Sequence, residues 1–278
     1  MTHLPPSAGL NQVLRINVSS NARLFRQASG LVVSVPKSGR TWLRVLMHRY
    51  FSELLQMPFV LDAAALQQRG LPNLICTHDL WEHRTTRRLK DRLRGKHLVP
   101  RRLCREKPLV VLARDPRDVI VSLYFQLTRR TMKYQGSLPE MIRDRRFGIE
   151  TLVSVMNYWL ASWGEQRNFL LVRYEHCRTR PFEVFGGLVQ FLGFEIDRDK
   201  LIRSIEFASF DNMKRMEVEG KFDSGSLRPM DPSDAESFKV RRGVVGGYRR
   251  YLDATDLEYV ENALGRLDER FGYREILP

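Results

Sequence analysis

Residues 36–42, which read PKSGRTW, have the residue types and the spacing of an anion-binding loop. Lys37 supplies a positive charge, and Ser38 and Thr41 supply hydroxyl donors. Gly39 has no side chain, so a ligand can approach the backbone closely there. A loop that leads from a strand into a helix also favours a bound anion through its backbone N–H groups and the helix dipole. The alternative is an ordinary turn with an exposed lysine.

Two later segments have arginines that could bind phosphate groups. Arg114 offers a planar fork for a phosphate monoester, and Ser122 offers a hydroxyl donor two turns further along a predicted helix. Arg241 and Arg242 precede Gly243 in the segment KVRRGVVGGYRRYL. Read alone, each segment is also compatible with solvent-exposed arginines at a helix start or a turn.

A candidate catalytic base, His78, ends the apolar run in ICTHDL. Ligands of open α/β sheets bind at the carboxyl ends of the strands, which is where this histidine is expected. An imidazole with an ordinary pKa near ~6.5 can accept a proton from a hydroxyl at physiological pH. His83 is the rival base, and a structural role for His78 stays open.

Four short runs that are apolar on both faces indicate the strands that position these groups, at residues 31–35, 74–77, 109–113 and 169–174. Such runs are typical of parallel strands covered by helices on both sides. Helices are expected at residues 41–57, from 116 onwards, and at 149–163, 181–192, 198–206 and 256–271. We therefore predict an α/β, three-layer, P-loop-like fold with a central parallel sheet flanked by helices. Residues 1–278 are expected to form a single domain, with an N-terminal extension at 1–29 and a lid loop at 219–237.

Composition limits the function without deciding it. The net charge is +14, from 46 Lys and Arg against 32 Asp and Glu, so the surface should attract anions. No RNA- or DNA-binding motif is visible, and nucleic acid is not the expected partner. No apolar run has the length of a membrane span, and the N-terminal residues lack the apolar core of a signal peptide, so we expect a cytoplasmic protein. Three widely spaced cysteines predict neither a disulfide framework nor a zinc site.

The loop at residues 36–42 is not a Walker A motif, which has a glycine directly before the lysine. The predicted strands end at Pro36, His78, Arg114 and Tyr174, none of which is a carboxylate that could hold Mg²⁺. An ATP-dependent P-loop kinase is therefore an alternative and not the main hypothesis. The other alternative is a non-catalytic polyanion-binding protein.

Residues 36–42 resemble the PKSGTTW loop of the sulfotransferases that use 3′-phosphoadenosine-5′-phosphosulfate (PAPS), with Arg40 in place of one threonine. In that family the lysine and the loop amides hold the 5′-phosphosulfate, and the tryptophan stacks on the adenine. The resemblance gives these donor-binding roles to Lys37, Ser38, Gly39, Arg40, Thr41 and Trp42. It also implies that Lys37 neutralises charge on the bridging oxygen as the bond to sulfur breaks.

Further segments resemble the family in the family's order. Residues 113–125 are similar to RNPRDVAVS, whose arginine and serine bind the 3′-phosphate, and residues 239–252 are similar to RKGxxGDW. The family's Ser-Phe pair at the adenine matches residues 209–210, and KTHLP, which carries the base, matches 76–80 with Cys76 in place of the lysine and no proline. The donor-binding candidates implied are Arg114, Ser122, Tyr174, Phe210, Arg241, Arg242 and Gly243, and the catalytic candidates are His78 and Lys37.

The resemblance thus implies a PAPS-dependent sulfotransferase that needs no metal and releases 3′-phosphoadenosine-5′-phosphate (PAP) after in-line attack by a hydroxyl or amine. Residues 82–107 are rich in arginine and lysine and exceed the family's usual connection, so we expect an inserted basic helix. It would receive an anionic glycan or a lipid surface, or it is simply a solvated face. The identity of the acceptor and homodimer formation stay open.

Overall fold

A four-stranded parallel sheet in the order β2-β1-β3-β4 forms the centre of the molecule. The computed structural model describes residues 20–61, 66–222, 231, 234, 238–240 and 243–274. The strands are β1 (Gly30–Val33), β2 (Leu74–Thr77), β3 (Leu109–Ala113) and β4 (Phe169–Arg173). Leu31 pairs with Ile75 on one side and with Leu109 on the other. The four apolar runs are therefore strands, and the predicted central parallel sheet is confirmed.

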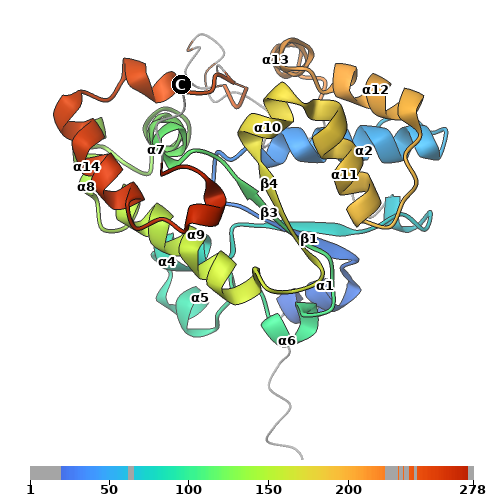
Figure 1. Ribbon diagram of the computed structural model, residues 1–278, viewed down its shortest axis with the longest axis horizontal. Coiled ribbons are helices and arrows are strands. Elements are labelled where there is room, and N and C mark those ends of the chain that lie inside the picture. Colours follow the sequence, from blue (N-terminus) through green and yellow to red (C-terminus); the bar gives the residue numbers. More distant parts are fainter. Residues whose placement is uncertain are drawn as a thin grey trace, which may run out of the picture.

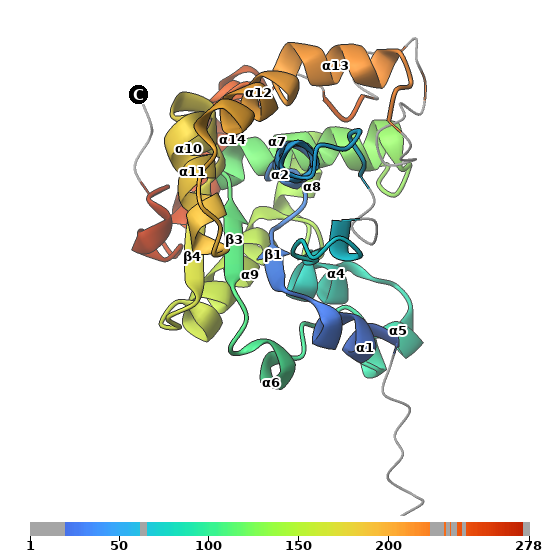
Figure 2. The ribbon, with the colours of Figure 1, turned by 90° about the vertical axis from the view of Figure 1, so that its right-hand side faces the viewer.

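Helices cover both faces of this sheet (Figure 1). One group comprises α4 (Asp79–Thr85), α7 (Pro116–Phe125), α8 (Leu138–Arg143), α9 (Ile149–Trp163) and α14 (Ala254–Leu264). The other group comprises α2 (Arg40–Leu54), α10 (Tyr174–Thr179), α11 (Pro181–Phe191), α12 (Arg198–Phe207) and α13 (Phe210–Val218). Figure 2 shows α12 and α13 at one end of the molecule, and α1 (Ser20–Gln27), α5 (Leu89–Leu93) and α6 (Arg101–Cys104) at the other.

Alternate strand residues pack into two different cores. Leu31 and Val33 belong to the apolar cluster that includes α7, α9 and α14, whereas Val32 belongs to the cluster that includes α2 and α11. In β3 the same alternation places Val111 in the first core and Val110 in the second. The continuous apolar runs thus reflect strands buried on both faces, and the predicted three-layer α/β fold is confirmed.

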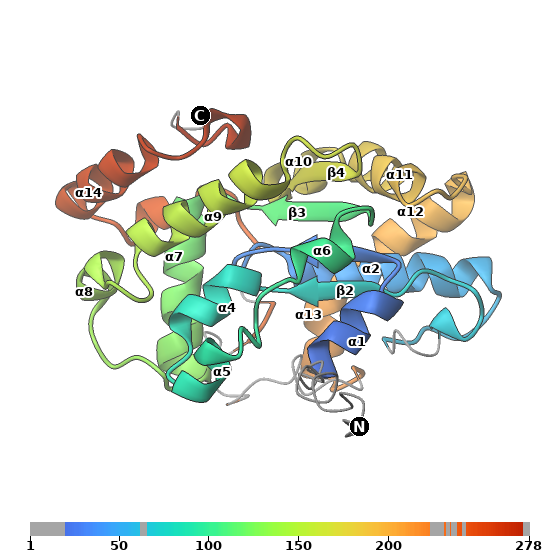
Figure 3. The ribbon, with the colours of Figure 1, turned by 90° about the horizontal axis from the view of Figure 1, so that it is seen from below.

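The prediction of one inserted basic helix within residues 82–107 is wrong. The segment forms α4, α5 and α6, and Figure 3 shows α4 and α5 on the side of the sheet where α9 lies. Gly95 ends the middle helix with a φ of 56°, a left-handed conformation that favours glycine, and Pro100 immediately precedes α6. The helix expected at residues 256–271 also divides, because α14 ends at Leu264 and a separate 3₁₀ turn, η5 (Glu269–Phe271), follows.

Several expectations lie wholly or partly outside the described residues. The lid loop expected at 219–237 is described only at residues 219–222, 231 and 234, and the N-terminal extension only from residue 20. Arg241 and Arg242 also lie outside the described residues. None of the helices in the described ranges combines the length and apolar character needed to cross a bilayer.

A buried ion-pair network at the start of α7 should dominate the stability of this side of the sheet. The Arg117 side chain is fully buried and donates to Asp115 and Glu261, both at 2.8 Å, and to the carbonyl oxygen of Tyr273. Replacing Arg117 with methionine leaves two carboxylates without their cation, so we expect the free energy of unfolding to fall by about 3–5 kcal/mol. Urea denaturation, with the exposed Arg129→Met as control, measures this loss; a loss below about 1 kcal/mol would contradict it.

Candidate active site

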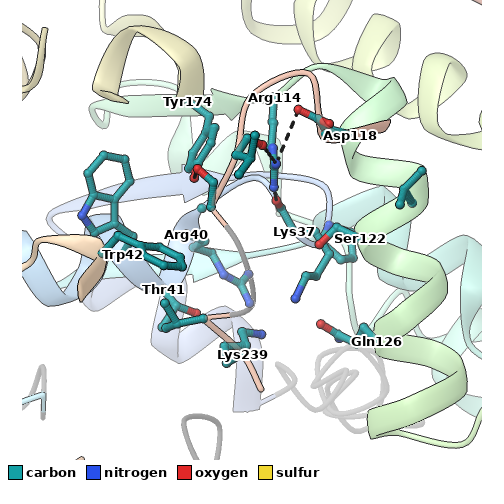
Figure 4. Close-up of a pocket in the computed structure, with 18 of the residues that line it drawn as sticks. Lys37, Arg40, Thr41, Trp42, Arg114, Asp118, Ser122, Gln126, Tyr174 and Lys239 are labelled. Atoms are coloured by element: carbon teal, nitrogen blue, oxygen red, sulfur yellow. Dashed lines mark hydrogen bonds and ion pairs between the residues drawn. The ribbon is translucent and has the colours of Figure 1, made fainter. Parts of the chain in front are cut away.

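One pocket collects loops from the carboxyl ends of all four strands. It is lined by the predicted residues Lys37, Gly39, Arg40, Thr41, Trp42, His78, Arg114, Ser122, Tyr174, Phe210 and Gly243. Figure 4 shows Trp42 and Tyr174 on one side of this pocket and Ser122 and Gln126 on the other, with Arg40 between them. Ser38 is the exception, because its side chain is fully buried and does not line the pocket. Its hydroxyl has no hydrogen-bond partner within the described part of the chain.

The loop after β1 has the backbone of an anion-binding turn. Gly39 has a φ of 92° and precedes the first residue of α2, and no side chain caps that helix terminus. The first N–H groups of α2 are therefore available to a ligand. Lys37 also lies in the left-handed region, with a φ of 72°, which is unusual for a residue with a side chain. The loop thus has strained backbone at Lys37, whereas Gly39 adopts its positive φ without strain.

Tyr174 fixes the shape of the pocket wall. A Cβ atom at residue 39 would lie 2.6 Å from the Tyr174 ring, so the loop can pass this ring only with glycine at residue 39. The Tyr174 ring also meets the Trp42 ring edge-on, at 5.7 Å between centroids. Its hydroxyl donates to the carbonyl oxygen of Gly243 at 3.4 Å, and burial raises the pKa of this phenol. Tyr174 therefore joins the β1 loop to the segment that begins at Gly243.

Two aromatic rings lie beside one arginine in the pocket wall. The Arg178 guanidinium lies 5.9 Å from the centroids of both the Trp42 and the Phe210 rings. The Trp42 indole N–H donates to the carbonyl oxygen of Ala208 at 2.7 Å, which fixes the ring. A Cβ at Gly243 would lie 2.5 Å from the Phe210 ring, so glycine is required there too. These flat surfaces suit stacking of an aromatic base.

Arg114 binds the backbone at the top of the pocket. Its guanidinium donates to the carbonyl oxygens of Lys37 at 3.2 Å and Val244 at 3.0 Å, and it lies 3.5 Å from the Asp118 carboxylate. The Asp118 carboxylate in turn accepts from the backbone N–H groups of Gly246 and Tyr248. Arg114, at the end of β3, thus connects the loop after β1 to the segment that begins at Gly243, and Ser122 lies further along α7.

His78 has the hydrogen bonding of a neutral base. Its Nδ1 lies 2.7 Å from the carbonyl oxygen of Ser34, which can only accept, so Nδ1 carries the proton and Nε2 has a free lone pair. Burial, followed by the positive charges of Arg40 and Lys239, lowers the pKa of His78 to about 3, and the hydrogen bond to Ser34 opposes part of this shift. The ring is therefore unprotonated at physiological pH. His83, the rival base, does not line the pocket.

Sequence reasoning missed several side chains in the pocket wall. Asp118 could have been found from its position four residues after Arg114 on a predicted helix. Arg178, Gln126 and Lys239 carry no local signal, because only tertiary packing brings them to the pocket. Burial, and after it the positive charges of Arg130 and Arg40, lowers the pKa of Lys239 to about 8. No group of three His, Cys, Asp or Glu side chains that could hold a metal ion occurs within the described ranges.

Comparison with known proteins adds sequence and fold relatives. The sulfotransferase domain model matches residues 28–272. Cytosolic sulfotransferase 13 of Arabidopsis thaliana is 27% identical over 250 residues, covering 82% of this chain and 72% of its own. The 3-beta-hydroxysteroid sulfotransferase of Cavia porcellus is 24% identical over 278 residues, covering 91% and 89%. Among solved structures, a mouse sulfotransferase complexed with PAP has a TM-score of 0.57 at 16% identity, covering 86% of this chain and 83% of its own. Retinol dehydratase with retinol and PAP has a TM-score of 0.59 at 16% identity, covering 95% and 88%.

Proposed function

The chain belongs to the family of PAPS-dependent sulfotransferases, and we propose that it transfers the sulfuryl group of PAPS, in the pocket described above, to a hydroxyl or amine of an acceptor. The single observation that carries the proposal is the shared location of three features. The glycine loop after β1, the aromatic pair and His78 come from separate parts of the sequence and line one pocket.

The donor would extend from the aromatic pair to the base. Trp42 and Phe210 stack on the adenine, with Arg178 beside both rings. Arg114 and Ser122 bind the 3′-phosphate at the β3 end, where a guanidinium and a hydroxyl provide donors. Arg241 and Arg242 are proposed to join this group, as their sequence segment suggests. The 5′-phosphosulfate lies on Lys37, on the backbone of Gly39 and on the backbone and side chains of Arg40 and Thr41, with Ser38 contributing its backbone N–H.

Catalysis then needs alignment and one proton transfer. The acceptor oxygen or nitrogen attacks sulfur in line, the bond from sulfur to the bridging oxygen breaks, and the electron pair stays on the departing 5′-phosphate of PAP. The acceptor proton passes to Nε2 of His78, whose other nitrogen is held by Ser34. Lys37 stabilises the charge that develops on the bridging oxygen.

The experiment that tests this function follows PAP release from PAPS with a panel of hydroxyl and amine acceptors. We expect equal amounts of PAP and sulfated product, with no requirement for Mg²⁺. Consumption of Mg²⁺-ATP with no PAP formed would favour the kinase alternative. Binding of polyanions without any turnover would favour the non-catalytic alternative.

We further propose that the acceptor carries anionic groups and is an anionic glycan. A surface groove is lined by Arg84, Arg87, Arg92, Arg145 and Arg146 together with Thr86 and Leu89. Arg87 also depresses the pKa of Arg146, after the larger effect of burial, which indicates that the two guanidinium groups lie near each other. Asp144 offsets part of this charge. Because α4 begins directly after His78, the groove begins about 9 Å along that helix from the base.

Charge reversal tests the glycan-binding groove. The double variant Arg87→Glu/Arg92→Glu should weaken binding of dextran sulfate about 10-fold or more at low salt, with a smaller dependence on ionic strength. The control Lys90→Glu/Arg102→Glu makes the same change of charge at exposed positions outside the groove and should have less than about a threefold effect. Equal losses in both variants, or binding to phosphatidylserine vesicles with none to dextran sulfate, would contradict a glycan site. A cytoplasmic location is also proposed, on the support of relatives named cytosolic sulfotransferases.

A further inference from the structure

Two departures from the family pattern lie close together in the structure. Arg40 stands where the family's loop has a threonine, and Cys76 stands where the segment before the base has a lysine. Arg40 is the first residue of α2, and Cys76 is the third residue of β2, paired with Val32 of β1. Cys76 packs against the core that contains Val32 and α2, the helix that begins at Arg40. The sequence has therefore lost a cation at residue 76 and gained one in the adjoining loop.

The electrostatics of the pair agree with this proximity. Burial raises the pKa of Cys76, and Arg40 is the foremost charge that opposes the shift. Burial also lowers the pKa of Arg40, and Cys76 is again the foremost charge that opposes it. The Arg40 guanidinium and the Cys76 thiol therefore lie near each other, and the raised pKa keeps that thiol neutral.

Arg40 is a half-buried cation without a carboxylate partner. It lines the pocket, and no Asp or Glu lies within 4.0 Å of its guanidinium in the described part of the chain. Lys239, opposite it in Figure 4, lines the same pocket. Desolvating a cation is costly unless an anion compensates it, so this arrangement indicates a site for an anionic group beside His78. The group that the proposed reaction places there is the sulfuryl group of the donor.

We propose that Arg40 is a catalytic residue that binds the sulfuryl oxygens of PAPS and supplies, from the loop, the positive charge that the family pattern places at residue 76. The proposal rests on the proposed function. During transfer, the sulfuryl group passes between two oxygens with its three outer oxygens exposed to the pocket. The planar guanidinium can donate two parallel hydrogen bonds to such oxygens. Arg40 therefore acts on the transferred group, whereas Arg114 and Ser122 act on the adenosine end.

An exchange of the two residues tests this. The variant Arg40→Thr should lower the rate of PAP release from PAPS about 10²-fold, with water as acceptor if no other has been identified. Its affinity for PAP, which has no sulfuryl group, should stay within about threefold of wild type. Adding Cys76→Lys to Arg40→Thr should restore the rate to within about fivefold of wild type, because the lysine on β2 again supplies a positive charge. Cys76→Lys alone should give no gain, because it places two cations together.

The control is Arg44→Thr, which removes a cation from the next turn of α2 that does not line the pocket, and it should change the rate less than about threefold. A wild-type rate in Arg40→Thr, or a double variant no faster than Arg40→Thr while its thermal midpoint equals that of wild type, would overturn the proposal. If the double variant unfolds, the variant Arg40→Lys replaces it as the test of rescue, because it keeps a positive charge at residue 40 without changing residue 76. A rate in Arg40→Lys no faster than that of Arg40→Thr would then overturn the proposal. Wild-type protein that neither binds PAP nor releases it from PAPS would instead overturn the proposed function, so the two failures are distinguishable.

Discussion

Replacing His78 with alanine is expected to lower kcat about 10²- to 10⁴-fold while leaving the affinity for PAP within about threefold of wild type. The effect is large because Nε2 is the only proton acceptor that the proposed mechanism uses, and its lone pair is set by the hydrogen bond from Nδ1 to Ser34. PAP binding is spared because its charged groups lie on other segments of the pocket. Acceptor turnover and PAP calorimetry measure the two quantities.

Two variants separate catalysis from structure. His83→Ala, on the same helix but outside the pocket, should keep kcat within about threefold. His78→Gln can still donate to Ser34 but cannot take a proton, so it should be as inactive as alanine. Activity in His78→Gln close to wild type would show that His78 only positions the loop.

The pH profile follows from the environment of His78. A histidine whose pKa is lowered stays unprotonated until the pH falls well below the ordinary value near ~6.5. Since burial brings the pKa of His78 to about 3 in the free protein, kcat/KM should show no acidic limb at that ordinary value. A limb at pH ~6.5 that disappears in His78→Gln would contradict the described environment.

Replacing Lys37 with glycine should lower kcat about 10²- to 10³-fold without lowering thermal stability. The loss of rate follows from removing the charge at the bridging oxygen. The stability expectation has a separate cause, because Lys37 has a φ of 72°, a conformation that costs a residue with a side chain about 1–2 kcal/mol. Glycine relieves this cost and offsets its own greater freedom in the unfolded chain.

The matched control for this prediction is Lys37→Met, which removes the charge but keeps the side chain and the strained backbone. It should be as slow as Lys37→Gly and no more stable than wild type. Turnover assays and thermal denaturation measure both properties. A methionine variant that keeps full activity would remove Lys37 from the mechanism, and a glycine variant with a clearly lower midpoint would show that its backbone is not strained.

The fold was predictable because its strands are buried on both faces. Val32 and Leu31 point to different cores, so the run had to be apolar at every position, and that pattern is visible in sequence. The start of α7 was equally visible, since Asp115 caps it and Pro116 follows. The prediction of one helix within residues 82–107 was wrong because the charge pattern there resembles that of a single helix, whereas Gly95 interrupts the segment with a left-handed backbone conformation.

From residue types and spacing alone, the site was predictable only where its residues lie in a strand-end segment, whereas Phe210 and Gly243 were predicted through the resemblance to the family. His78 and Arg114 follow apolar runs directly, and the sheet geometry brings them together. Arg178 and Lys239 reach the pocket through packing of α10 and of the segment before Gly243, for which the sequence has no local pattern. The proximity of Arg40 to Cys76 likewise required the structure, since the rest of α2 and residues 55–73 separate the two positions in the sequence.

Calorimetry of PAP and ADP on wild type and Arg114→Ala tests whether the pocket binds a 3′-phosphorylated adenosine donor. We expect wild type to bind PAP about 100-fold or more tightly than ADP, because the 3′-phosphate gains charge-assisted hydrogen bonds. Arg114→Ala should lose most of that preference while binding ADP nearly as wild type does. Equal affinity for PAP and ADP in wild type would contradict this expectation.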